Sequence, residues 1–142
     1  MKIMVGLDKD SLFYSEYQEQ VDLALSYVKE GKLDSAISSF QQLILSFPDY
    51  SLAYFYLGTL YSIQNKYQQA LSCFSQAWDR KSDSDIFLKE LPFKSVFLLV
   101  SQEKVNKREL QKWVSRAKLF YDTYETQQRA LIDIAEELLQ LI

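Results

Sequence analysis

The chain has 142 residues, of which 48% are apolar and 25% are charged, and its formal net charge is −3. This length and composition predict one folded domain with a sizeable core. The acidic balance argues against a nucleic-acid-binding protein, because such proteins usually present a basic face to the phosphates. Only three glycines and two prolines are present. Long stretches therefore lack helix breakers, and this favours helices.

The amino-terminal stretch MKIMVGLDKD has an apolar run shorter than the roughly 7–15 residues of a secretory signal. No window approaches the ~18 consecutive apolar residues of a membrane-spanning helix. A single cysteine excludes an internal disulfide. We therefore expect a cytoplasmic protein that does not enter a membrane, with residues 1–16 forming an amino-terminal arm.

A repeat with a period of 34 residues follows this arm. The stretch YVKEGKLDSAISSF (27–40) returns as YSIQNKYQQALSCF (61–74), with Gly31 replaced by Asn65. A fixed period of this size indicates stacked helix–turn–helix units, and the apolar spacing on both sides of the turn is helical. Gly31 and Asn65 are residue types that tolerate the left-handed conformation in which helices often end.

Small residues recur where the two antiparallel helices of a hairpin would approach each other. These residues are Ala24, Ala36, Gly58 and Ala70. Phe40 and Phe74 are expected to fill the space beside them. The Pro48–Asp49 step ends the first repeat, and we expect Asp49 to cap the helix that follows.

The rest of the chain predicts a less regular third hairpin and a last helix. LPFKSVFLLVSQ (91–102) and ELQKWVSRAKLFY (109–121) are the expected helices of the hairpin. Residues 123–142 predict a terminal capping helix with the apolar stripe Leu131, Ile134, Ala135, Leu138 and Ile142, which is widened by Ile132, Leu139 and Leu141. A stripe of this width suits a helix that packs on the third unit, or one that also contacts another subunit. A repeat stack needs about three units to bury a core, so we expect an all-α protein.

No pattern in the chain indicates catalysis. Histidine is absent, which removes the commonest general base and most zinc sites. Cys73 precedes a core phenylalanine and is expected to be a buried small residue rather than a reactive thiol. Trp78 and Trp113 are expected to pack between helices. We therefore predict that the protein is not an enzyme, holds no metal or cofactor, and works through a binding surface.

The two repeats resemble the tetratricopeptide repeat family. In residues 17–50 the family pattern is met by Leu23, Ala24, Tyr27, Ala36, Phe40 and Pro48. In residues 51–84 it is met by Tyr54, Leu57, Gly58, Tyr61, Ala70, Phe74 and Ala77. Ser82 stands where the family has a closing proline. The resemblance implies a superhelix of about three units within residues 17–122 (17–50, 51–84 and about 91–122), closed by the helix 123–142.

In that family the first helix of each unit lines a concave groove. Carried over by position, the resemblance implies a peptide-binding groove of Val21, Leu25, Val28, Leu52, Phe55, Tyr56 and Thr59, continued by Val96 and Leu99. This apolar row suits an extended protein segment with hydrophobic anchors. One branch of the family clamps a terminal carboxylate with Lys and Asn, but this chain has Val21 and Leu25 there. The alternative is that residues 1–15, with Leu7, Leu12, Phe13 and Tyr14, fill the groove from within.

The layout of an arm, an irregular third unit and one closing helix resembles the small tetratricopeptide chaperones of bacterial type III secretion. That resemblance implies a chaperone whose groove holds an extended segment of an aggregation-prone translocator. Where that family favours aromatic residues, this chain has the aliphatic Val21, Leu25 and Val28. Chaperones of needle subunits share the layout. An adaptor or scaffold subunit that docks through its terminal helix is the alternative function, and the sequence leaves a homodimer or a heterodimer open.

Overall fold

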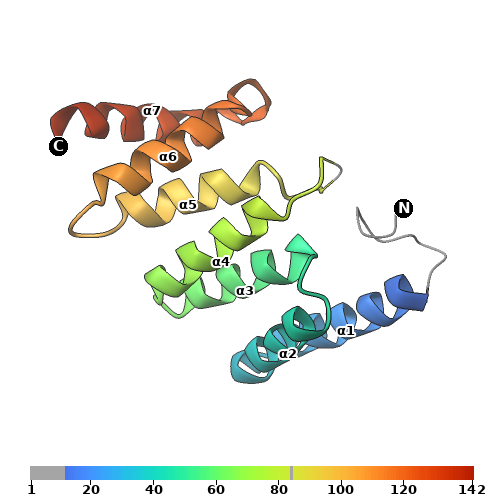
Figure 1. Ribbon diagram of the computed structural model, residues 1–142. Coiled ribbons are helices and arrows are strands. Elements are labelled where there is room, and N and C mark those ends of the chain that lie inside the picture. Colours follow the sequence, from blue (N-terminus) through green and yellow to red (C-terminus); the bar gives the residue numbers. More distant parts are fainter. Residues whose placement is uncertain (1–11, 84) are drawn as a thin grey trace. The chain divides into compact units, whose positions relative to one another are not determined.

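The computed structural model describes residues 12–83 and 85–142, with the side chains of 12–14 left out (Figure 1). Within these residues the structure is helical and contains no strand. The helices are α1 (Leu12–Lys29), α2 (Leu33–Ser46), α3 (Ser51–Ile63), α4 (Tyr67–Asp79), α5 (Glu90–Val100), α6 (Lys107–Lys118), the 3₁₀ helix η2 (Tyr121–Thr123) and α7 (Thr126–Leu141). They form two compact units, α1 to α4 and α5 to α7. Most of the predicted arm lies outside the described residues, and residues 12–16 belong to α1.

The first unit consists of two helical hairpins with the same turn. Helix α1 packs on α2 and α3 on α4, and α2 joins the two hairpins by packing on α3. Gly31 and Asn65 both have positive φ, 76° and 61°, as their residue types predicted. After each of them the next backbone N–H closes the helix end: Lys32 donates to the Tyr27 carbonyl at 2.8 Å and Lys66 to the Tyr61 carbonyl at 2.9 Å. The sequence repeat is therefore also a repeat of hydrogen bonds.

The small residues predicted at the hairpin contacts lie in the core. Ala24, Ala36 and Ala70 have no exposed surface. At Gly58 the helix is even closer to its neighbour, because an added Cβ would lie 2.7 Å from the Phe74 ring. A side chain of any size would collide there, so the close helix approach requires glycine.

Helix α3 does not begin as predicted, since Asp49 is not its cap. The N-cap position is Tyr50, and its side chain makes no capping hydrogen bond. The start of α3 is held instead by aromatic packing, in which the rings of Tyr17 and Tyr50 meet edge to face at 5.3 Å. The Phe47 ring stacks on Tyr50 at 6.0 Å. Aromatic packing thus lies where the sequence suggested a capping carboxylate, although rings do not replace the hydrogen bond of such a cap.

In the second unit α5 packs on α6 and α7, and α6 packs on α7. Its core includes Trp113, which has no exposed surface, as predicted. Only part of the wide apolar stripe predicted for the last helix faces the core. The buried residues of α7 are Ile132 and Ala135, whereas Ile134 is 59% exposed and Ile142 is 44% exposed.

Candidate peptide-binding surface

Helix α3 has the sequence SLAYFYLGTLYSI and carries no charged residue. One side of the helix is buried in the first unit, through Ala53, Leu57, Gly58 and Leu60 among others. The other side contains Leu52, Phe55, Tyr56 and Thr59, all half-buried, and it ends at Ile63, which is 59% exposed. A surface helix ordinarily turns a polar face to water. The outward side of α3, residues 52, 55, 56, 59 and 63, is called the α3 face below.

Aromatic rings form the centre of the α3 face and are supported from behind by two other helices. The Tyr56 ring stacks on Phe40 of α2, with centroids 5.4 Å apart and planes at 28°. The Phe55 ring lies 5.6 Å from Tyr56 and 6.2 Å from Phe74 of α4. Because Phe40 and Phe74 are fully buried, the half-buried rings of Phe55 and Tyr56 rest on a fixed support. Such a surface is ordered before anything binds to it, which lowers the entropy cost of binding.

Two hydroxyl groups beside the rings already use their protons. Thr59 Oγ1 donates to the Phe55 carbonyl at 3.0 Å, and Ser62 Oγ donates to the Thr59 carbonyl at 2.7 Å. A hydroxyl oxygen that donates in this way keeps lone pairs that accept hydrogen bonds. The α3 face therefore offers acceptors to the N–H groups of an extended segment.

Helix α1 contributes the predicted aliphatic residues of the first repeat. Leu25 and Val28 are half-buried and pack against the same core as Leu52 and Tyr56. On the solvent side of α1 the exposed Asp22 accepts a hydrogen bond of 2.9 Å from Gln18. The α1 residues thus combine an aliphatic strip with a polar edge.

Three of the residues predicted for the groove lie in the interior. Val21, Val96 and Leu99 are 2%, 0% and 2% exposed. Val21 is part of the core of the first unit, while Val96 and Leu99 are buried residues of α5. A covered side chain has no surface to offer a ligand, so their predicted place on the surface is corrected. The other six predicted residues keep partly exposed side chains.

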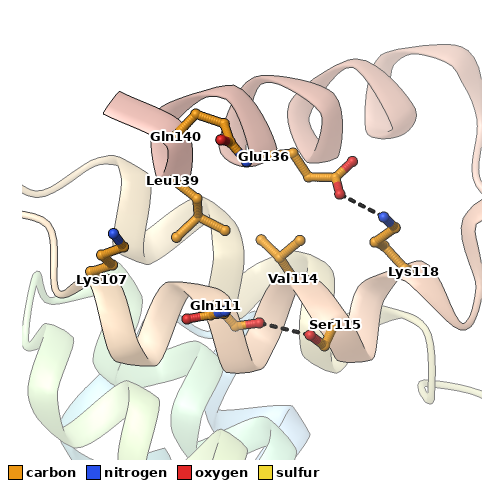
Figure 2. A pocket seen from close by; sticks show the side chains of 8 residues that line it. All are labelled: Lys107, Gln111, Val114, Ser115, Lys118, Glu136, Leu139 and Gln140. Atoms are coloured by element: carbon orange, nitrogen blue, oxygen red, sulfur yellow. Dashed lines mark hydrogen bonds and ion pairs between the residues drawn. The ribbon is translucent and has the colours of Figure 1, made fainter. Parts of the chain in front are cut away.

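The second unit contains a hollow that the sequence analysis did not predict (Figure 2). It has a volume of about 410 Å³ and lies between α6 and α7, lined by Lys107, Gln111, Val114, Ser115, Lys118, Glu136, Leu139 and Gln140. Figure 2 shows Val114 and Leu139 facing each other across it. No sequence signal marked it, because its residues come from two helices and have no motif.

The charges around this hollow are already partnered. Lys118 Nζ lies 2.6 Å from a carboxylate oxygen of Glu136. Lys107 Nζ donates to the Ile142 carbonyl at 2.8 Å. Both ammonium groups beside the hollow therefore have a partner within the chain.

The described residues include one thiol whose pKa is shifted by burial. Burial raises the pKa of the Cys73 thiol to about 11, so it is protonated at neutral pH and a poor nucleophile. Residues 12–83 and 85–142 contain no group of three or more His, Cys, Asp or Glu that could hold a metal ion. None of the described helices is long and apolar enough to cross a membrane.

Two family models, both described as tetratricopeptide repeat, match the chain over residues 39–72 and 20–50. These segments overlap the repeats recognised in the sequence, so the predicted resemblance to tetratricopeptide proteins is confirmed. Among curated proteins, none matches the sequence significantly.

Solved structures of type III secretion proteins share the fold. The chaperone SycD of Yersinia enterocolitica, in complex with a peptide of the translocator YopD, has a TM-score of 0.65 and 20% identity, over 89% of this chain and 94% of that chain. PcrH in complex with the chaperone-binding region of PopD has a TM-score of 0.63 and 20% identity, over 96% and 93%. A complex from Aeromonas hydrophila has a TM-score of 0.65 and 16% identity, over 89% and 80%. The predicted fold class, all-α with tetratricopeptide repeats and a C-terminal helix, is confirmed.

Proposed function

We propose that this protein is a non-enzymatic chaperone that binds an extended segment of an aggregation-prone client on its α3 face and on Leu25 and Val28 of α1. The client is a translocator of type III secretion, and the complex forms in the cytoplasm. The observation that carries the proposal is the α3 face itself: an uncharged helix whose aromatic outward side remains partly exposed.

Two further facts support this function. Contiguous apolar surface on a folded protein commonly marks a binding site, and here rigid rings form its centre. SycD and PcrH share the fold; SycD was determined with a peptide of the translocator YopD, and PcrH with the chaperone-binding region of PopD. A client segment with aliphatic or aromatic anchors gains about 1.5–3 kcal/mol for each side chain fully buried. A few anchors on this surface therefore suffice for a moderate, reversible affinity.

The first experiment compares wild type with Phe55→Asp in pull-downs from the native cytosol, followed by mass spectrometry. Leu45→Asp is the matched control, because Leu45 is 74% exposed on α2 and lies outside the proposed surface. We expect wild type and Leu45→Asp to retain the same apolar secreted protein and Phe55→Asp to lose it. With that client purified, calorimetry should show a loss of about 2 kcal/mol for Phe55→Asp, which is roughly a 30-fold weaker affinity.

Circular dichroism separates loss of binding from loss of fold. If Phe55→Asp is unfolded, Ile63→Asp replaces it, because Ile63 is 59% exposed and its substitution leaves the core intact. Retention of one unchanged set of partners by wild type, Phe55→Asp and Ile63→Asp would contradict the proposal.

The alternative function is that of an adaptor subunit in a stable complex, which contacts its partner through α7. This alternative has its own observation, since Leu141 at the end of α7 is 83% exposed. An adaptor would lose its partner on Leu138→Asp or Ile142→Asp and keep it on Phe55→Asp. The same pull-down therefore distinguishes the two functions.

A further inference from the structure

The residues in front of α1 have the chemistry that the proposed surface selects. In MKIMVGL (1–7), the aliphatic residues Ile3, Val5 and Leu7 recur at every second position. Successive side chains of an extended chain point to opposite sides, so an extended conformation places these three on one side. The polar residues DKDS (8–11) follow, and Asp and Ser are residue types that favour turns. Residues 1–7, called the 1–7 segment below, thus have the anchors expected of a client.

The proposed surface lies within reach of this segment. Residues 1–11 join α1 at Leu12. The start of α1 lies beside the start of α3, because the Tyr17 ring meets the ring of Tyr50, the N-cap of α3, at 5.3 Å. From Leu12 to Val28 the axis of α1 rises by about 24 Å. After a turn within residues 8–11, seven extended residues span about 23 Å, so the 1–7 segment can cover the surface along its length.

We infer that the 1–7 segment binds in extended form to the α3 face and to Leu25 and Val28 of its own chain, and that the client displaces it. This inference rests on the proposed function, because it concerns the regulation of the same surface. The half-buried rings of Phe55 and Tyr56 receive the aliphatic side chains. The Thr59 hydroxyl, which donates to the Phe55 carbonyl, keeps acceptor lone pairs for the N–H groups of an extended backbone.

The charges of the segment and of α1 agree with this contact. Lys2 is the one charged residue of the 1–7 segment. Helix α1 exposes the acidic residues Glu16, Glu19 and Asp22 and has no basic residue before Lys29. Opposite charges therefore meet when the segment lies along α1, and such complementarity favours this partner over an acidic one.

The covalent connection makes a weak contact effective. A connection of a few residues gives the segment a local concentration on the order of millimolar, so three aliphatic anchors suffice for partial occupancy. A surface that is occupied half of the time binds a client about twofold more weakly. A client with more anchors therefore still displaces the segment, while partners with fewer anchors are excluded.

Nuclear magnetic resonance of the full chain tests this contact without a client. We expect nuclear Overhauser contacts from the methyl groups of Ile3 and Val5 to the rings of Phe55 and Tyr56. A mixture of isotope-labelled and unlabelled chains distinguishes contacts within one copy from contacts between copies.

Two substitutions in the segment make a matched pair. Ile3→Asp should remove the contacts and shift the amide signals of Phe55 and Tyr56, because a carboxylate on apolar rings would lose its hydration. Met4→Asp is the control, since Met4 lies on the other side of an extended segment, and it should keep the contacts of wild type. Both positions precede the described helices, and circular dichroism checks that the fold is unchanged.

The client isolated with wild type gives a second measurement. Its affinity for Ile3→Asp should be about twofold higher than its affinity for wild type or Met4→Asp. The inference is overturned if the Overhauser contacts are absent, if they occur only between copies, if Met4→Asp removes them as fully as Ile3→Asp, or if Ile3→Asp binds the client no more tightly. These outcomes leave the proposed function intact, whereas a client retained by Phe55→Asp would contradict the proposed function.

Discussion

The two units of this protein hold their helices together in different ways. In the first unit the contacts are apolar and close, as at Gly58 and Phe74, and each hairpin turn is closed by one residue of positive φ. In the second unit polar side chains hold the connections. Tyr124 donates to the Lys89 carbonyl at 2.6 Å, and Lys89 Nζ donates to the Thr123 carbonyl at 3.1 Å. The first unit also has side chains that bind the backbone, since Arg80 Nε donates to the Pro48 carbonyl at 2.8 Å. The two units therefore differ in how their connections are made: positive-φ turns close both hairpins of the first, and side-chain hydrogen bonds hold the connection before α7 in the second.

Arg129 adds two further hydrogen bonds from a side chain to the backbone at the start of α7. Together with those of Tyr124 and Lys89, they are called the clasp below. Arg129 Nε donates to the Tyr121 carbonyl and Arg129 Nη2 to the Asp122 carbonyl, both at 3.1 Å. These carbonyls belong to η2, where the ordinary helix hydrogen bonds stop. Arg129 thus gives the Asp122 carbonyl a donor and the Tyr121 carbonyl a second donor, beside the Tyr124 N–H at 3.2 Å. The difference between the units can therefore be tested by removing one close contact in the first and one clasp in the second.

The largest effect is expected for Gly58→Ala in the first unit. An added Cβ would lie 2.7 Å from the Phe74 ring and 3.1 Å from Cys73 Cβ, so the helices must move apart. Overpacking of this kind costs about 1–3 kcal/mol, although alanine in a helix interior ordinarily stabilises by about 0.5–1 kcal/mol relative to glycine. Urea unfolding followed by circular dichroism should give a clearly lower free energy of unfolding for Gly58→Ala. Unchanged or increased stability would show that the helices are not in contact at this point.

A smaller effect is expected for Tyr124→Phe in the second unit. The substitution removes only the hydroxyl that donates to the Lys89 carbonyl, while the ring, which is 2% exposed and lies 6.0 Å from Phe93, keeps its packing. Removing one partner of a hydrogen bond in such a covered place costs about 1–2 kcal/mol. The same urea titration measures it, with Tyr121→Phe as control, because the Tyr121 hydroxyl bonds the exposed Asp133 carboxylate. Equal losses for the two variants would mean that the clasp has no special role.

Much of the first unit could be predicted because its turns and helix faces depend on residues that are close together in the sequence. The positive φ of Gly31 and Asn65 and the burial of Ala36 and Ala70 follow from residue type and spacing. The failure at Asp49 has a long-range cause, since Tyr50 packs on Tyr17, which lies far away in the sequence. Local patterns do not reveal such a contact.

The residues predicted for the candidate site also differ between the regular repeats, where the prediction described the surface, and the irregular third hairpin, where it did not. Phe55 and Tyr56 keep partly exposed rings, as expected from their repeat positions, while Val96 and Leu99 are buried. In the third hairpin the repeat pattern is weak, and positions carried over from a regular repeat no longer describe its surface. In α7 the apolar arc is wide, and periodicity alone did not determine that Ile132 rather than Ile134 faces the core.

The smallest effect on the free energy of unfolding is expected for Gly31→Asn, which compares the two turns of the first unit. Gly31 has a φ of 76°, and an added Cβ would meet nothing within 4 Å, so only backbone strain opposes substitution. Asparagine adopts this conformation readily and already does so at Asn65. Gly31→Asn should therefore change the free energy of unfolding by less than about 0.5 kcal/mol, whereas Gly31→Ala should cost about 1–2 kcal/mol. If urea unfolding showed equal losses for both variants, something other than the left-handed backbone would distinguish the two turns. The difference between the variants thus measures how far one turn can replace the other.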